Sequence, residues 1–130
     1  MKYVLMVVCL ALFPFQSFSK DLKGYSKTYN TCMTEANGTT FDTISCQQDE
    51  LDIQDKRLNQ YYKALMKNLN SSRQEELRVS QRAWLVFRNT NCAFYLDPDG
   101  GSMHRVLSSD CVLSHTTRRA NELKDMLEIF

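Results

Sequence analysis

Four cysteines follow a segment with the features of an export signal, and this combination constrains the fold more than any other part of the chain. Lys2 precedes an apolar stretch at residues 4–13 that is too short to span a bilayer. Residues 17–19 (Ser-Phe-Ser) match the small-x-small pattern that signal peptidases cleave. We therefore expect a signal peptide at residues 1–19 that is cleaved near Ser19, and a periplasmic or secreted mature chain. In such an oxidising compartment the default state of Cys32, Cys46, Cys92 and Cys111 is two disulfides.

The mature chain, residues 20–130, has the length of one small domain. Removing Lys2 from the sixteen basic residues leaves fifteen, which balance the fifteen acidic ones. This balance argues against nucleic acid as the partner, because phosphate binding needs an excess of basic residues on one face. No apolar run after the signal is long enough to span a membrane.

Glycine and proline mark the ends of the expected helices. Gly38 and the loop at residues 97–102 bound a stretch without either residue, and only a polar turn at residues 70–72 interrupts it. The pattern predicts two long helices joined by that turn, a third after the loop, and a short helical segment at residues 23–35. The expected N-caps are Thr39 or Thr40, Ser72 and Ser102.

Apolar residues recur at heptad spacing in all three long segments, as they do in packed antiparallel helices. The run at residues 84–87 is apolar on all sides, which favours the second long helix as the central one. The fold class predicted is therefore all-α: a small up-down-up three-helix bundle with a short N-terminal helical segment, stapled by two disulfides. The rows that indicate it include Ile44, Leu51, Leu58 and Leu65, then Leu77 and Trp84, and finally Val106, Leu113, Ala120 and Leu127.

Polar residues on the same rows predict a structural polar core. If the first two long helices turn back at residues 70–72, equal rise per residue brings Asp55 level with Arg88, and Tyr62 level with Gln81. A buried or half-buried carboxylate–guanidinium pair would specify the register of the helices, and losing one partner would destabilise the protein. Trp84 is expected to pack in the core beside them.

Two sequence blocks and the segment after them carry a family resemblance over about residues 32–127. The blocks comprise Glu50-Leu51, Asp55, Leu58-Asn59, Tyr62 and Leu65, then Gln81-Arg82-Ala83-Trp84-Leu85, Phe87-Arg88 and Cys92, followed by Gly100-Gly101-Ser102, Cys111, Thr116, Arg119 and Leu123. Together they resemble the signature of the lysozyme inhibitor LprI-like N-terminal domain family.

The resemblance implies a small, helical, exported bacterial domain that binds protein and inhibits lysozyme. The family takes its name from a lipoprotein, but Cys9 is preceded by Val7-Val8 and is a poor lipid-attachment site. We therefore do not expect this chain to have the membrane anchor of that lipoprotein. The alternative is a periplasmic envelope accessory or effector/immunity protein with a different protein partner.

Acidic residues are concentrated where the predicted bundle would bring two segments to one end. Host-defence lysozymes are cationic, so an acidic rim with the loop as an insertion element would suit a basic cleft. The helix dipole alone also explains acids near a helix N-terminus, and that alternative stays open. The expected binding residues are Asp42, Asp49, Glu50 and Asp52, with Asp97, Asp99, Gly100, Gly101 and Ser102.

Other chemistries find little support in the residues. The sequence at residues 97–100 lacks most ligands of a calcium loop, and His104 and His115 have no metal-ligand partner at helical spacing. No Cys-x-x-Cys or nucleophile-elbow motif is present. We expect no catalytic residue, no metal and no cofactor, and hence no enzyme.

Three disulfide pairings are possible for four cysteines. Cys92 and Cys111 lie nearly level across a turn near Gly100, within the spacing that a disulfide requires. This favours Cys92–Cys111 together with Cys32–Cys46 over the two other pairings.

Overall fold

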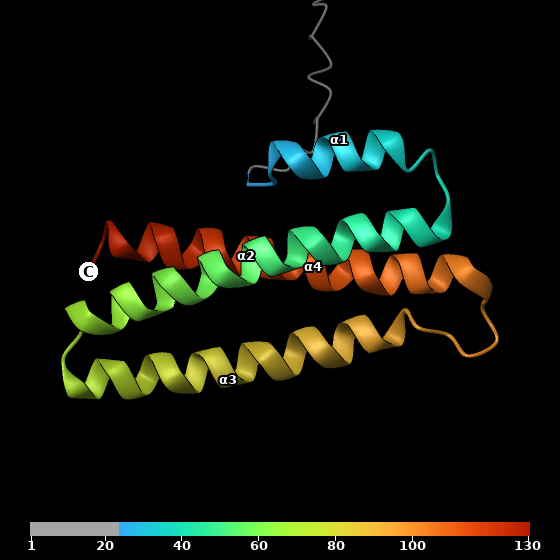
Figure 1. Cartoon of the computed structure of the whole chain (residues 1–130). Coiled ribbons are helices and arrows are strands. Elements are labelled where there is room, and N and C mark those ends of the chain that lie inside the picture. The colour runs from blue at the N-terminus through green and yellow to red at the C-terminus, as the bar shows by residue number, and fades with distance from the viewer. Residues whose placement is uncertain (1–23) are drawn as a thin grey trace, which may run out of the picture.

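The computed structural model describes residues 24–130 and contains four helices in this range, with no strand. The prediction of an all-α, three-helix bundle with a short N-terminal helix is confirmed (Figure 1). The predicted signal peptide, residues 1–19, lies outside the described residues. The helices are α1 (Lys27–Glu35), α2 (Thr40–Asn68), α3 (Ser71–Phe94) and α4 (Gly101–Leu127).

Of the three N-caps expected for the long helices, one is confirmed and two are corrected. Thr39 caps α2 as expected, because its side chain accepts a hydrogen bond from the backbone N–H of Asp42. Asn70, and not Ser72, caps α3, since its Oδ1 accepts from Arg73 N at 3.1 Å. Gly100 precedes α4 without a side-chain cap, so Ser102 already lies in the first turn of that helix.

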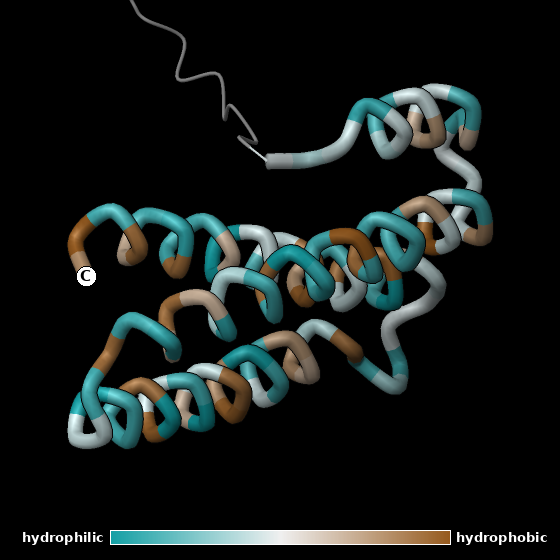
Figure 2. Tube along the Cα trace, turned by 60° about the vertical axis from the view of Figure 1, so that its left-hand side comes forward, coloured by the Kyte–Doolittle hydropathy of each residue, from teal (hydrophilic) through white to brown (hydrophobic). Residues whose placement is uncertain are grey.

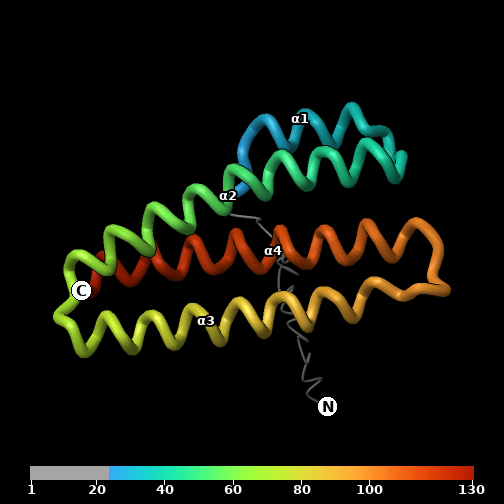
Figure 3. The backbone as a smooth tube through the Cα atoms, turned by 60° about the horizontal axis from the view of Figure 1, so that its bottom comes forward, coloured from blue at the N-terminus to red at the C-terminus, as the bar shows by residue number. Residues whose placement is uncertain are grey.

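The helix that packs against both neighbours is α4, which corrects the expectation that the second long helix is central. α4 packs closely along α2 and also against α3, whereas α2 and α3 diverge from the turn that joins them (Figures 1 and 3). Hydrophobic residues recur along α3 (Figure 2), yet only Leu77 and Cys92 of this helix are buried. Within the apolar run at residues 84–87, Leu85, Val86 and Phe87 are therefore exposed, whereas Trp84 is partly buried against the core.

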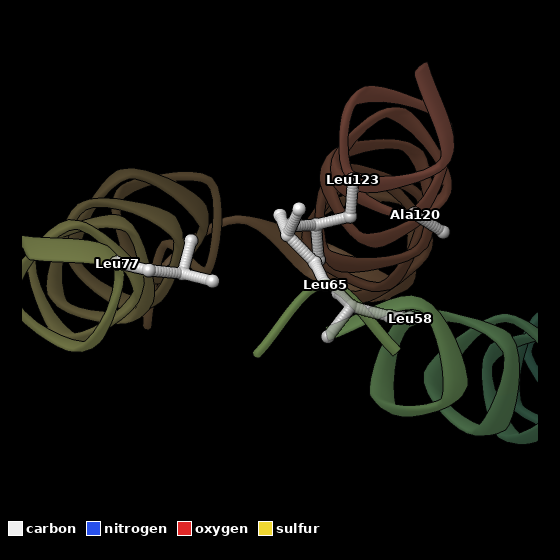
Figure 4. Close-up of a cluster of buried hydrophobic side chains, with 5 residues drawn as sticks. All are labelled: Leu58, Leu65, Leu77, Ala120 and Leu123. Carbon is white, nitrogen blue, oxygen red and sulfur yellow. The ribbon is translucent and has the colours of Figure 1, made fainter. Parts of the chain in front are cut away.

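The main hydrophobic core lies where the three long helices meet. It joins two leucines of α2 and one of α3 to α4, with Tyr62 and Trp84 packed against its edge. Figure 4 shows how the side chains converge. The buried members are Leu58, Leu65, Leu77, Ala120 and Leu123.

A buried polar network attaches α1 to the bundle and corrects the expectation for Glu50. Glu50 is only 1% exposed, and its carboxylate accepts hydrogen bonds from Ser26 N (2.9 Å) and Ser26 Oγ (2.5 Å). Gln54 Nε2 donates to the same carboxylate and to the carbonyl of Gly24. Because Ser26 also caps α1, Glu50 fixes the start of that helix and is not part of an exposed acidic rim.

The disulfides are those that the sequence favoured. Cys32–Cys46 joins α1 to α2 with a Cα–Cα distance of 5.7 Å, and Cys92–Cys111 joins α3 to α4 at 5.4 Å. Two intramolecular disulfides are typical of proteins that fold outside the cytoplasm. Among residues 24–130, no helix has the combination of length and apolarity needed to cross a membrane.

Candidate functional site

The connection between α3 and α4 is a short loop at residues 95–100, at the end of the bundle where α2 begins (Figures 1 and 3). Asp97 organises its turn. The Asp97 carboxylate accepts from Asp99 N at 2.9 Å, and the Asp97 carbonyl accepts from Gly100 N at 3.1 Å. Both aspartates remain exposed, so the negative charges of this ordered turn face solvent.

The base of the loop is fastened to α4. The Cys92–Cys111 disulfide crosses below it, Ser108 Oγ donates to the Cys92 carbonyl at 3.0 Å, and His104 Nδ1 donates to the Tyr95 carbonyl at 3.2 Å. A Cβ added to Gly100 would lie 2.4 Å from the His104 ring, so only glycine leaves room for this ring. A loop held in this way loses little conformational entropy when it binds a partner.

Large apolar side chains surround the same loop, a feature that the acidic pattern in the sequence did not reveal. Phe94 is 87% exposed at the end of α3, and the exposed Tyr95 and Leu96 follow it. Met103 and Leu107 add further exposed apolar surface on the first turns of α4. Exposed apolar groups rimmed by charge are typical of protein interaction surfaces, so this loop is the strongest candidate for one.

The predicted acidic residues come from two segments, and all except the buried Glu50 are exposed. Asp42, Asp49 and Asp52 are exposed on α2, and the first two line pockets beside α1. Asp97 and Asp99 lie in the loop, and the exposed Gly101 and Ser102 begin α4 directly after it.

The residues expected to form a polar core instead border a groove between α2 and α3. The groove has a volume of about 390 Å³ and exists because α3 leans on α4, away from α2. Its lining includes four of the five predicted residues and five residues that were not predicted to form a site. The lining residues are Asp55, Leu58, Asn59, Tyr62, Arg78, Gln81, Arg82, Trp84 and Leu85.

Asp55 and Arg88 form no direct ion pair, contrary to expectation. Asp55 is exposed and accepts a hydrogen bond from Asn59 Nδ2 at 2.9 Å. Arg88 is half-buried and donates to Thr116 Oγ1 at 3.1 Å and to the Asn89 side chain. Burial lowers the pKa of Arg88, while the Asp55 carboxylate acts in the opposite direction. Their interaction is therefore a longer-range attraction across the helices.

Trp84 and Gln81 contact an arginine, Arg119, that was not predicted as a site residue and was named only as part of the family resemblance. Arg119 of α4 is buried, donates from Nε to Gln81 Oε1 at 3.0 Å, and lies 5.9 Å from the centre of the Trp84 ring. Arg88 lies 5.1 Å from the same ring centre. The spacing of Thr116, Arg119 and Leu123, all buried on one face of α4, is the signal that could have identified it.

One group in the described part of the chain has three possible metal ligands close together, namely Cys92, Cys111 and His115. The two sulfur atoms are joined to each other in a disulfide and are not thiolates. The oxidised protein therefore offers only the His115 ring here, which is not a metal site.

Comparison with known proteins agrees with the helical architecture and the cysteine pattern. The family model for lysozyme inhibitor LprI matches residues 32–123, from the first disulfide cysteine to the leucine core of α4. An uncharacterised protein of Rhizobium meliloti (strain 1021) is 38% identical over 55 residues, which is 42% of this chain and 40% of that protein. No solved structure matches the chain. The chain belongs to the lysozyme inhibitor LprI family.

Proposed function

We propose that this protein inhibits lysozyme in the periplasm or outside the cell, by binding the enzyme with the loop between α3 and α4. Residues 1–19 are its signal peptide, residues 20–130 form one domain, and its action is stoichiometric binding without catalysis. Family membership supports the choice of partner. The observation that carries the choice of surface is the ordered loop, which combines exposed Phe94 and Leu96 with the charges of Asp97 and Asp99.

The chemistry of this surface suits a cationic enzyme with an elongated cleft. The apolar side chains supply contact area, and the two carboxylates speed association with a positively charged partner. Because these charges are exposed, association should slow as salt is raised. The disulfide and the His104 contact keep the loop in shape before binding.

The test is a cell-wall lysis assay with purified, disulfide-bonded protein and a panel of lysozymes. Wild-type protein should slow lysis in proportion to its concentration. Leu96→Ser should weaken inhibition about tenfold or more, since central apolar contacts dominate binding. Ile129→Ser is the matched control, because Ile129 is also exposed but lies at the opposite end of the bundle.

The contribution of charge is tested separately with Asp97→Asn. Asparagine keeps an oxygen that can accept from Asp99 N, so the turn is retained while its charge is lost. This variant should bind more slowly at low salt. Undiminished lysis at a large molar excess of wild-type protein would refute the proposal for the enzymes tested, and recovery of another envelope protein would favour the accessory role.

A further inference from the structure

The groove between α2 and α3 is a separate cavity from the loop and has the character of a small-molecule site. Its floor is apolar, formed by Leu58, Tyr62 and Trp84, of which Leu58 is part of the buried core. Its walls are polar: Asp55 and Asn59 come from α2, and Gln81 with two arginines comes from α3. An apolar floor with a few convergent polar groups is the usual composition of a ligand pocket, and about 390 Å³ is within the usual size.

Several polar groups of the groove are not used by the fold. Arg82 is exposed and makes no hydrogen bond or ion pair with any other residue of the range 24–130. The Tyr62 hydroxyl likewise has no partner within that range, and the Gln81 amide nitrogen is free because Arg119 binds only its oxygen. Arg78 pairs with Glu75 at the rim, an exposed contact of little energetic value. The unused groups are thus mostly donors, with one unpaired cation.

The walls of the groove restrict the class of ligand. Both walls are helices, and their backbone groups are already hydrogen-bonded, so an extended peptide cannot pair with them as it does with a sheet edge. An amphipathic helix needs a continuous apolar groove, but Asp55, Arg78 and Arg82 interrupt this one. A compact ligand with many polar groups and an apolar face fits better. A pyranose has these properties, because its ring C–H groups suit the aromatic floor and its hydroxyls suit side-chain amides and carboxylates.

We infer that the groove between α2 and α3 binds a carboxylate-bearing saccharide, with the sugar ring on Tyr62 and Trp84 and the carboxylate on Arg82. Arginine is the side chain best suited to a carboxylate, since its planar guanidinium can donate two parallel hydrogen bonds. Asp55, Asn59 and the Gln81 amide bind the hydroxyl or acetamido groups. This site lies on different residues from the loop, so it does not depend on lysozyme binding.

The matched probes are N-acetylmuramic acid and N-acetylglucosamine, which share an N-acetylated pyranose and differ by the lactyl carboxylate. Trp84 lines the groove and is the single tryptophan of the chain, so a ligand that binds there should change its fluorescence. Isothermal titration calorimetry on the same samples detects binding that leaves the fluorescence unchanged. For a ligand of this size we expect a Kd on the order of 0.1–1 mM with N-acetylmuramic acid, and binding about tenfold or more weaker without the carboxylate.

Arg82→Gln should reduce the affinity for N-acetylmuramic acid about tenfold and leave the weak binding of N-acetylglucosamine unchanged. The matched control is Arg105→Gln, which removes an exposed arginine of α4 that does not line the groove and should bind like wild type. The inference is overturned if neither method detects saturable binding up to about 10 mM. Equal affinity for the two sugars would overturn it as well. So would an equal loss of affinity in Arg82→Gln and Arg105→Gln, or tighter binding of an acidic dipeptide than of N-acetylmuramic acid.

Discussion

Arg119 of α4 donates a hydrogen bond from Nε to Oε1 of Gln81 on α3, at 3.0 Å. The same guanidinium also binds Ser80 Oγ at 3.2 Å and Glu122 on its own helix at 3.0 Å. Because α3 buries so few of its apolar side chains, polar contacts of this kind carry much of its attachment to the bundle. Arg119 thus joins the core of α4 to the edge of the groove.

Arg119→Ala should lower the free energy of unfolding by about 2–3 kcal/mol. The substitution removes hydrogen bonds from a charged donor and the packing of its buried aliphatic stem. Urea titration followed by circular dichroism measures the change. Arg105→Ala removes an exposed arginine from the same helix and should stay within about 0.5 kcal/mol of wild type. Equal effects of the two changes would contradict the structural role of Arg119.

Leu123→Ala should cost about 2–5 kcal/mol, because the side chain is fully buried among the three long helices and its loss leaves a cavity. Leu107→Ala is the comparison on the same helix, since Leu107 is 43% exposed near the loop. It should unfold at nearly the wild-type urea concentration. A similar loss at both positions would mean that α4 does not occupy the centre of the core.

Gly100→Ala should distort the loop between α3 and α4 while leaving the bundle folded. The added Cβ would displace the His104 ring and break its hydrogen bond to Tyr95. We expect weaker lysozyme inhibition together with an unchanged helical circular dichroism spectrum. Ile129→Ser, at the opposite end of the bundle, should retain wild-type inhibition. Full inhibition by Gly100→Ala would show that the loop conformation is irrelevant to binding.

Acidic pH should destabilise the protein through His115. Burial lowers the pKa of His115 below its usual value of 6.5, and the charges of Arg118 and Arg88 lower it further, against a smaller opposing effect of Glu122. The unfolded chain therefore binds the proton more readily than the folded protein does. Stability from this residue is complete above about pH 6.5 and is lost as the pH falls below it.

Urea titrations between pH 7 and pH 5 measure this effect. The His115 ring lies 5.3 Å from the Phe87 ring and near Asn91, so substitution also changes packing at the surface of α3. The informative quantity is therefore the slope of stability with pH. His115→Gln should decline less steeply than wild type, and identical slopes would exclude His115 as the cause.

Removing the Cys92–Cys111 disulfide should cost about 3 kcal/mol, because it closes a loop of 19 residues in the unfolded chain. The double change Cys92→Ala with Cys111→Ala tests this by thermal unfolding. It should also free the base of the binding loop and weaken inhibition. The pair Cys32→Ala with Cys46→Ala is the control for inhibition, since this disulfide fastens α1 and not the loop.

The local features of the fold could be predicted from the sequence because they depend on short-range chemistry. Gly38 and the loop at residues 97–102 mark the ends of helices, which predicted how many long helices the chain forms. Cys92 and Cys111 were expected at nearly the same height on the two helices joined by the Gly100 turn, which favoured the observed disulfide pairing. Asn70 was missed as a cap because serine and asparagine have similar preferences for that position.

The arrangement of the helices could not be predicted in the same way. Level matching between Asp55 and Arg88 assumed that α2 and α3 lie side by side, whereas α4 packs against both. Most buried residues in the first half of α2 are polar, including Gln47 and Glu50, whereas Leu51 of the apolar row is only partly buried against a second hydrophobic cluster. A heptad pattern detects only helix faces that are buried through apolar residues. Glu50 can be buried because Ser26 and Gln54 donate hydrogen bonds to its carboxylate, and the pattern does not register such contacts.

The pairing of α2 with α4 has a consequence for the order of folding. Leu58 and Leu123 belong to one core, although all of α3 separates them in the sequence. A chain that crosses a membrane from its N-terminus therefore delivers α2 long before its main packing partner, so this core cannot close until nearly the whole chain has emerged. Removal of the C-terminal helix should therefore leave α2 without a core to join.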